Sequence, residues 1–305
     1  DRLWFAGLII IAANAGGAWS PIGDVTTTML WIGNKVTTLN LIKYLFIPSL
    51  ICMVVPALIA SRLPAFKGTI PEVEEDENDK VDQYSRIMLY LGLTAIIFVP
   101  IFKTVTHLPP YVGMMLSLAV VATFGELYSN SRISFTSLDH DSEESSHHSP
   151  VHRALSGIEM PSILFFLGIL MAVAALESLG VLFRFADGLT TTIPMLGTEL
   201  TDSGTQVSDL VVLIMGVASA VIDNVPLVAA SLGMFADPTD SPLWHFIAYS
   251  AGTGGSMLII GSAAGVVAMG MEKINFFWYL KKISLLALIG FLAGAVTFMF
   301  MRIIL

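Results

Sequence analysis

Long apolar segments with few charges dominate this sequence of 305 residues. Charged residues make up 13% and hydrophobic residues 55%, and the mean hydropathy is +0.77, whereas a soluble domain carries about 25% charged residues. Inside a bilayer every backbone N–H and C=O must be satisfied within the protein, which favours helices. The segments are also much longer than the strands of a membrane barrel, which have roughly 10 residues. The composition therefore predicts an all-α polytopic membrane protein in a lipid bilayer.

Two of the apolar segments are interrupted by similar glycine-rich stretches. Residues 15–24 read Ala-Gly-Gly-Ala-Trp-Ser-Pro-Ile-Gly-Asp, and residues 253–262 read Thr-Gly-Gly-Ser-Met-Leu-Ile-Ile-Gly-Ser. Interrupted segments at corresponding positions of an internal repeat indicate a transporter binding site. We therefore predict an inverted-repeat transporter with two broken helices, in residues 3–32 and 243–270. The matched glycines at the breaks are Gly16, Gly17 and Gly23 in the first copy and Gly254, Gly255 and Gly261 in the second.

A third interruption lies within residues 209–236. Two apolar arms of about 10–14 residues flank the sequence Asp-Asn-Val-Pro at 223–226, and each arm is shorter than the ~20 residues that a helix needs to cross a bilayer. Pro226 cannot continue the hydrogen-bond ladder of a helix. The pattern predicts a re-entrant helical hairpin with Asp223 and Asn224 at its tip.

The rest of the chain predicts spanning helices and polar loops. Spans are expected at 41–60, 87–102, 111–128 and 158–180, and loops at 62–86 and 129–156. The loops hold eleven of the 24 acids and four histidines, and solvated loops are favoured there over a metal site or a pH sensor. We divide the chain into a first broken helix of the transport domain (1–33), scaffold-type spans with the two loops (34–180), a second-repeat transport domain (181–275) and a final spanning helix (276–305).

Several functions have no support in the sequence. The net charge is −9 and no basic face exists, so nucleic acid is not an expected partner. No nucleophile triad, phosphate-binding loop or metal motif is present, so neither an enzyme nor a cofactor is expected. Cys52 is the single cysteine, which excludes an intramolecular disulfide; we expect it to be a packing residue.

Three acids in apolar surroundings are the candidates for chemistry: Asp24, Asp223 and Glu177. An ionisable residue within the membrane marks a functional site by default, because burying it is costly. Asp223 is the strongest candidate, since a carboxylate and the carbonyls freed at a helix break are hard oxygen ligands that suit Na⁺. The alternative is that Asp223 and Asp24 only cap the helices that follow them. Glu177 fits a proton relay and a residue near the membrane edge equally well.

Polar neighbours accompany these acids. Asn224 and Ser219 lie close to Asp223 in the sequence. The second glycine-rich copy supplies hydroxyls where the first supplies Asn14 and Asp24, although hydroxyls and glycines are also common in helix packing. The further site residues predicted on these grounds are Asn14, Thr26, Thr27, Thr253, Ser256 and Ser262.

A buried carboxylate of this kind is a site for which two ions compete. Desolvation disfavours its charged form, whereas a bound cation favours that form. Loading the site with Na⁺ therefore expels H⁺, and reorientation then carries each ion singly. We predict exchange of Na⁺ (or Li⁺) for H⁺, with Na⁺ bound at Asp24 and Asp223.

Residues 13–31, 219–226 and 252–265 resemble the NhaD-type Na⁺/H⁺ antiporters of the ion transporter superfamily. The resemblance implies a scaffold domain, a transport domain with two hairpins and two broken helices, elevator-type movement and a homodimer in a membrane, bacterial rather than plastid. It also implies that the family's first hairpin precedes residue 1, so we expect the N-terminal part of the transporter to be missing, by truncation or as a separate polypeptide. The residues that match polar family positions are Asn14, Asp24, Thr26, Thr27, Ser219, Asp223 and Asn224.

Two other readings compete with a cation antiporter. The same superfamily contains carriers of dicarboxylates, citrate and arsenite, but an anion site favours neutral Ser, Asn and Thr at helix N-termini over Asp24 and Asp223. A membrane subunit or receptor without transport is the other class, and it predicts that Asp223→Asn is silent.

Overall fold

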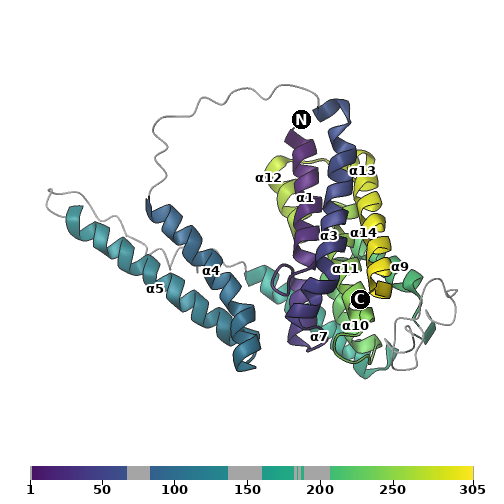
Figure 1. The fold of residues 1–305 in the computed structure, drawn as a ribbon, viewed down its shortest axis with the longest axis horizontal. Helices are drawn as coiled ribbons and strands as arrows, with labels where there is room; N and C mark the ends of the chain where they lie inside the picture. Colours follow the sequence, from purple (N-terminus) through teal and green to yellow (C-terminus); the bar gives the residue numbers. More distant parts are fainter. Residues whose placement is uncertain are drawn as a thin grey trace. The chain divides into compact units, whose positions relative to one another are not determined.

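The structure is a computed structural model that describes residues 2–66, 83–136, 160–181, 184, 187–188 and 207–304. Within these residues the secondary structure is helical, and none of them forms a strand (Figure 1). The chain divides into two compact units: Asp1–Ile70 together with Phe166–Leu305, and Pro71–Phe165. Our division of the sequence into four segments stays a prediction.

Four helices among the described residues are long and apolar enough to cross a membrane. They are α3 (Thr38–Ser61), Arg86–Thr106 of α4 (Gln83–Thr106), Pro110–Leu127 of α5 (Pro110–Thr136) and α14 (Ser284–Ile304). α7 (Met160–Ser178) lies in the span predicted at 158–180, and the short turn η1 (Pro64–Phe66) follows α3. The prediction of an all-α polytopic membrane protein is confirmed.

α4 and α5 pack against each other in the smaller unit. The Ser117 hydroxyl donates to the Ala95 carbonyl at 3.0 Å, and a Cβ on Gly113 would lie 2.9 Å from the ring of Phe102. Both helices are longer than predicted: α4 begins before and ends after 87–102, and α5 runs into the predicted loop 129–156. The rest of that loop, and residues 67–82 of the other, lie outside the described residues.

In the larger unit, α3 packs on α14 and on α1 (Arg2–Ala18), and the three helices run side by side in Figure 1. Small residues allow the close approach: a Cβ on Gly290 would lie 2.5 Å from the Cys52 carbonyl oxygen. Pro56 has no N–H to donate to that carbonyl, so the free oxygen faces α14 instead. Cys52 itself is 1% exposed, in agreement with a packing role.

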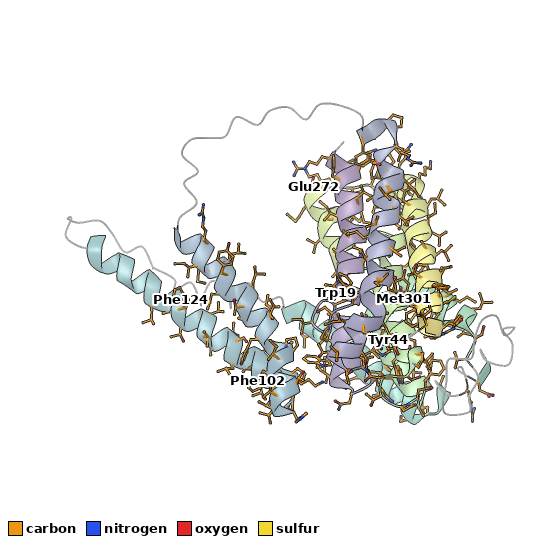
Figure 2. The ribbon with its side chains drawn as sticks, viewed as in Figure 1. Trp19, Tyr44, Phe102, Phe124, Glu272 and Met301 are labelled. Atoms are coloured by element: carbon orange, nitrogen blue, oxygen red, sulfur yellow. The ribbon has the colours of Figure 1, made fainter. Side chains whose placement is uncertain are left out.

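Both predicted broken helices are present. The first consists of α1, a break at 19–24 and α2 (Val25–Ile32); the second consists of α11 (Pro242–Gly254), the 3-10 turn η2 (Gly255–Met257), a break at 258–262 and α12 (Ala263–Glu272). The prediction that the first break begins at the glycine pair was wrong, because α1 continues through Gly16 and Gly17 to Ala18. Trp19, labelled in Figure 2, directly follows the end of α1. Its ring packs edge-on against the ring of Phe46 in α3, with the ring centres 5.3 Å apart.

The predicted hairpin segment forms α9 (Asp209–Ile222) and α10 (Asn224–Met234), which pack together and meet at Asp223. Pro226 lies in the first turn of α10, where its missing N–H costs no helical bond. That the pair re-enters from one side of a membrane stays a prediction. The last predicted span is divided at Ile283 into α13 (Phe276–Lys282) and α14.

Candidate functional site

The two glycine-rich breaks fold in the same way. A Cβ on Gly23 would lie 2.7 Å from the Gly17 carbonyl oxygen, and a Cβ on Gly261 would lie 2.7 Å from that of Gly255. Real Cβ contacts of this length essentially do not occur, so both close approaches require glycine. The last glycine of each break also donates its N–H to the carbonyl three residues earlier, at 3.1 Å in the first copy and 3.0 Å in the second. The repeat read from the sequence is therefore a structural repeat.

Asp24 and Ser262, the matched residues that end the breaks, share one backbone conformation. Asp24 has φ −144° and ψ 155°, and Ser262 has φ −153° and ψ 152°. Each caps the helix that follows: Asp24 accepts a hydrogen bond from Val25 N, and Ser262 accepts one from Gly265 N. The capping role considered for Asp24 is thus present, and the next observations show what else its carboxylate contacts.

A cavity of about 210 Å³ lies where the first break, the tip between α9 and α10, and the start of α12 meet. Six of the residues predicted from the sequence line it, with apolar residues beside them. They are Asn14, Gly23, Asp24, Asp223, Asn224 and Ser262. The fold thus brings together, in one cavity, side chains that lie up to 248 residues apart in the chain.

Asp24 is the most heavily hydrogen-bonded group in this cavity. Its Oδ1 accepts from Val25 N at 2.8 Å, and its Oδ2 accepts from the Thr26 hydroxyl at 2.6 Å. Oδ2 also accepts from Asn224 Nδ2 at 3.0 Å, across the two repeats. Donors on three different residues therefore fix the position of the carboxylate while one of its sides stays open to the cavity.

Asp223 has an unusual backbone. Its φ is +74° and its ψ is 147°, a region that is almost restricted to glycine and that costs about 1–3 kcal/mol for other residues. The carboxylate accepts from Asn224 N at 2.7 Å, so it also caps α10. Strain of this kind persists at sites where the surroundings over-determine the conformation, and here it places an acid at the junction of two helices.

Asn14 connects the first broken helix to the second. Its Nδ2 donates to the Ile10 carbonyl and to the Ser262 hydroxyl, both at 3.0 Å. Its side-chain carbonyl has no hydrogen-bond donor among the described contacts. The two repeats are therefore joined twice at the cavity, by Asn14 with Ser262 and by Asn224 with Asp24.

The remaining predicted hydroxyls are buried and do not line the cavity. The Ser219 hydroxyl donates to the carbonyl oxygens of Gly216, at 2.8 Å, and Ala251, at 3.2 Å. The Thr253 hydroxyl donates to the Tyr249 carbonyl at 2.6 Å. The Ser256 hydroxyl donates to the Thr253 carbonyl at 2.7 Å. Thr27 lies 2.7 Å from Ser20 O and 3.0 Å from Asp24 O. These hydroxyls satisfy carbonyls near the breaks, so the structure gives them a supporting position.

Three other predicted positions differ in their surroundings. Gly254 is tightly packed against α9, where an added Cβ would meet the Gly216 carbonyl and the Ser219 hydroxyl, whereas an added Cβ on Gly16 has open space within 4 Å. Glu177 falls in α7, but its side chain lies outside the described residues.

One buried contact was missed from the sequence. The Tyr279 hydroxyl of α13 donates to the Ser256 carbonyl at 2.7 Å, and so satisfies a backbone group at the second break. In the sequence, Tyr279 stands in an aromatic run that is typical of a membrane interface, and nothing local indicates its partner.

The cavity is lined by acidic, amide and hydroxyl side chains. Two carboxylates, from Asp24 and Asp223, face it, and among the described residues that line it there is no lysine, arginine or histidine. Carboxylate, amide and hydroxyl oxygens are hard ligands, which small cations with tightly held water prefer.

The comparisons with known proteins agree with this chemistry. The sequence profile of the citrate transporter family matches residues 2–244. The chain belongs to the citrate transporter family. It is 43% identical over 306 residues to "Sodium/proton antiporter 1" of Arabidopsis thaliana, with 98% of this chain and 48% of that protein covered. It is 36% identical over 296 residues to "Na(+)/H(+) antiporter NhaD" of Vibrio parahaemolyticus, with 92% of this chain and 67% of that protein covered.

The resemblance to NhaD-type antiporters noted in the sequence is confirmed by these relatives. They are transporters and not enzymes, and together with the spanning helices they identify a multi-pass integral membrane protein. The chain spans about half the length of the first of these relatives and about two thirds of the second. No solved structure was found to match the chain.

Proposed function

We propose that this chain carries the ion site of a secondary transporter that exchanges Na⁺ or Li⁺ for H⁺. The observation that carries the proposal is that Asp24 and Asp223, which belong to different repeats, line one cavity together with Asn14, Asn224 and Ser262. A carboxylate in such a cavity gains from either a proton or a cation, because both relieve the cost of an unpaired charge away from bulk water. One site then serves two ions in alternation.

Asn224 supplies the chemical switch for this exchange. Its amide nitrogen donates to Oδ2 of Asp24 at 3.0 Å, an arrangement that suits the ionised carboxylate. An amide also carries an acceptor oxygen, so a turn of the Asn224 side chain would present oxygen instead of N–H. That oxygen would serve as a ligand for Na⁺ or would accept a hydrogen bond from protonated Asp24.

The movement that carries the ion is proposed to be of the elevator type, in a homodimer, as the family resemblance implies. The contact of Asn14 with Ser262 and the contact of Asn224 with Asp24 support movement of the site as one body. Opening either repeat alone would break one of these buried contacts. A rigid site carried past a scaffold requires no such break.

An anion carrier is the second candidate, because the matching family profile is described as that of a citrate transporter. The first residues of α2, α10 and α12 line the cavity, and helix N-termini attract anions. However, Asp24, Asp223 and Ser262 already cap these three helices. An incoming carboxylate would meet two negative charges in place of free N–H groups, so the geometry favours a cation.

The two candidates are separated by an ion panel on the complete protein in proteoliposomes with a preset pH difference. Separate additions of Na⁺, Li⁺, K⁺, citrate and succinate are followed with a pH-sensitive dye and by isotope uptake. Na⁺ or Li⁺ is expected to dissipate the pH difference, and citrate and succinate are not. Citrate uptake without cation-driven proton movement would support the anion carrier, and no response to any ion would support a protein without transport.

A further inference from the structure

The helices that deliver Asp24 and Asn224 to the cavity are joined a second time, at their far ends. α2 and α10 pack against each other. At their starts, Asn224 donates to Asp24. After their ends, the linker at 33–37 that leads from α2 to α3 meets the loop at 235–241 that leads from α10 to α11. The pair of helices is therefore held at both ends.

Asp240 is the centre of this distant contact. Its Oδ1 accepts from Thr37 N at 2.7 Å, and its Oδ2 accepts from the Thr37 hydroxyl at 2.8 Å and from Asn40 Nδ2 at 2.9 Å. Its own N–H donates to the Lys35 carbonyl at 2.8 Å. One residue of the second repeat thus makes four hydrogen bonds to the segment that follows α2.

Neighbouring contacts reinforce the same junction. The Thr239 hydroxyl donates to the Asn34 carbonyl at 2.6 Å. The Lys35 ammonium donates to the Asp237 carbonyl at 3.2 Å, and it lies 4.7 Å from the centre of the Trp244 ring. Asn34 and Asp240 both have positive φ, at 54° and 61°, a conformation that Asn and Asp adopt more readily than most residues. Each of the two turns thus contains one residue in this conformation.

We propose that Asp240 is a positioning residue: it clamps the outer ends of α2 and α10 and so keeps Asp24 and Asn224 in register at the cavity. Its consequence for transport rests on the proposed function, whereas the clamp itself does not. A purely local role, in which Asp240 orders only the two linkers, is the alternative.

Asp240 keeps its charge under ordinary conditions. Burial opposes ionisation, but the neighbouring His245 and hydrogen bonds from Thr37 and Asn40 outweigh it and hold the pKa of the Asp240 carboxyl below its usual range. His245 Nε2 lies 3.4 Å from Oδ1, and the His245 ring lies against Tyr44 with the ring centres 5.0 Å apart. The Asp240 carboxylate is therefore ionised at neutral pH.

The opposite end of the broken helices provides a matched control. There, Arg2 at the start of α1 pairs with Glu272 at the end of α12, with Nε and Oε2 2.6 Å apart. Figure 2 labels Glu272 at the end of the larger unit where the N-terminus lies in Figure 1. The Arg2 side chain is 82% exposed, and exposed ion pairs contribute little to stability.

Hydrogen–deuterium exchange on the complete protein tests the clamp without any transport assay. The proteins compared are wild type, Asp240→Asn and the control variant Glu272→Gln. Asp240→Asn is expected to speed exchange at least about tenfold through Val25–Ile32 and the first turns of α10, as expected for the loss of a hydrogen bond to a charged group. Asn40→Ala removes a single donor and gives a smaller increase in the same helices, so it serves if Asp240→Asn does not fold. Glu272→Gln leaves them unchanged. Faster exchange confined to 34–41 and 235–241 would overturn the proposal.

The link to the ion site is tested by a double-mutant cycle. Asp240→Asn is expected to weaken the apparent Na⁺ affinity about tenfold in the wild-type background and to add little in Asn224→Ala, since both act through one contact. Equal effects in both backgrounds would contradict positioning. If wild type moves no Na⁺, the proposed function fails, and the exchange measurement still decides the clamp.

Discussion

Asn224 and Asp24 meet across the internal repeat: the Asn224 amide nitrogen lies 3.0 Å from Oδ2 of Asp24, although 200 residues separate them in the chain. The contact joins the start of α10 to the start of α2. It also places the strained Asp223 on the same cavity as Asp24. Asp24 and Asp223 each cap a helix, and the contact brings both acids to one cavity.

Removal of the Asn224 amide should weaken cation binding more than it weakens the fold. Asn224→Ala takes one donor from Asp24 and one potential oxygen ligand from the cavity, so we expect the apparent Na⁺ affinity to fall about 10- to 100-fold, the range for a hydrogen bond to a charged group. Proton flux as a function of Na⁺ concentration measures this. Ser231→Ala is a matched control, because Ser231 lies on α10 and donates to Leu227 O away from the cavity. Equal losses in the two variants would contradict a specific role.

The glycines that close the breaks should not tolerate a methyl group. Gly23→Ala and Gly261→Ala each place a Cβ 2.7 Å from a carbonyl oxygen, and the overpacking should cost about 1–3 kcal/mol. Gly270→Ala on α12 meets nothing within 4 Å and should be neutral or stabilising, as for glycine in a helix interior. Thermal unfolding in detergent ranks the three variants; a Gly23→Ala protein as stable as Gly270→Ala would refute the close contact.

The buried ion pair between Arg302 and Asp209 should be needed for the hairpin segment to stay docked on α14. Arg302 Nη1 and Nη2 lie 2.8 and 2.9 Å from the two Asp209 oxygens, and the side chains are 8% and 2% exposed. Arg302→Ala leaves a buried carboxylate unpaired, so we expect a loss of about 3–5 kcal/mol. The double variant Arg302→Met with Asp209→Asn should recover much of it. Unfolding measurements in which the double variant is no better than Arg302→Ala would argue against pairing as the cause.

The stability that Asp240 contributes should depend on pH only in strongly acid solution. The pKa of its carboxyl is lower in the folded protein than the ordinary value of about 3.9 in an unfolded chain. A group with a depressed folded pKa stabilises the fold above the unfolded pKa, and this stabilisation is lost as the pH falls through the folded pKa.

The melting temperatures of wild type and Asp240→Asn should therefore differ by a constant amount between pH 6 and 9 and converge below about pH 4. A difference that changes between pH 6 and 8 would contradict an Asp240 carboxylate that stays ionised over that range.

The sequence was informative where polar residues interrupt apolar segments. Asp24, Asp223 and the glycine repeat predicted two broken helices and the tip of a helical pair, because charges and breaks within a membrane segment have few structural explanations. Five of the six predicted residues that line the cavity lie at these interruptions, and Asn14 lies near the end of α1.

The directions of the hydroxyl groups, the long-range partners and the end of α1 depended on tertiary contacts that the sequence does not display. Thr253 and Ser256 turn to carbonyls of their own segment, an option open to any helical hydroxyl, so their type did not reveal their direction. The partners of Tyr279, Asp240 and Arg302 lie 23, 203 and 93 residues away. The end of α1 was placed too early because glycine disfavours helix, whereas Gly17 is held in the helix by its contact with Gly23.

The most direct test of the account is Na⁺-driven proton movement in proteoliposomes that contain the complete protein, its Asp24→Asn variant or its Asp223→Asn variant, after folding of each is checked by thermal unfolding. Asparagine keeps the shape of each side chain and its capping oxygen, but it cannot exchange a proton for a cation. Exchange is predicted to be abolished in both variants. Exchange in either folded variant at the wild-type rate would contradict the assignment of that carboxylate to the ion site.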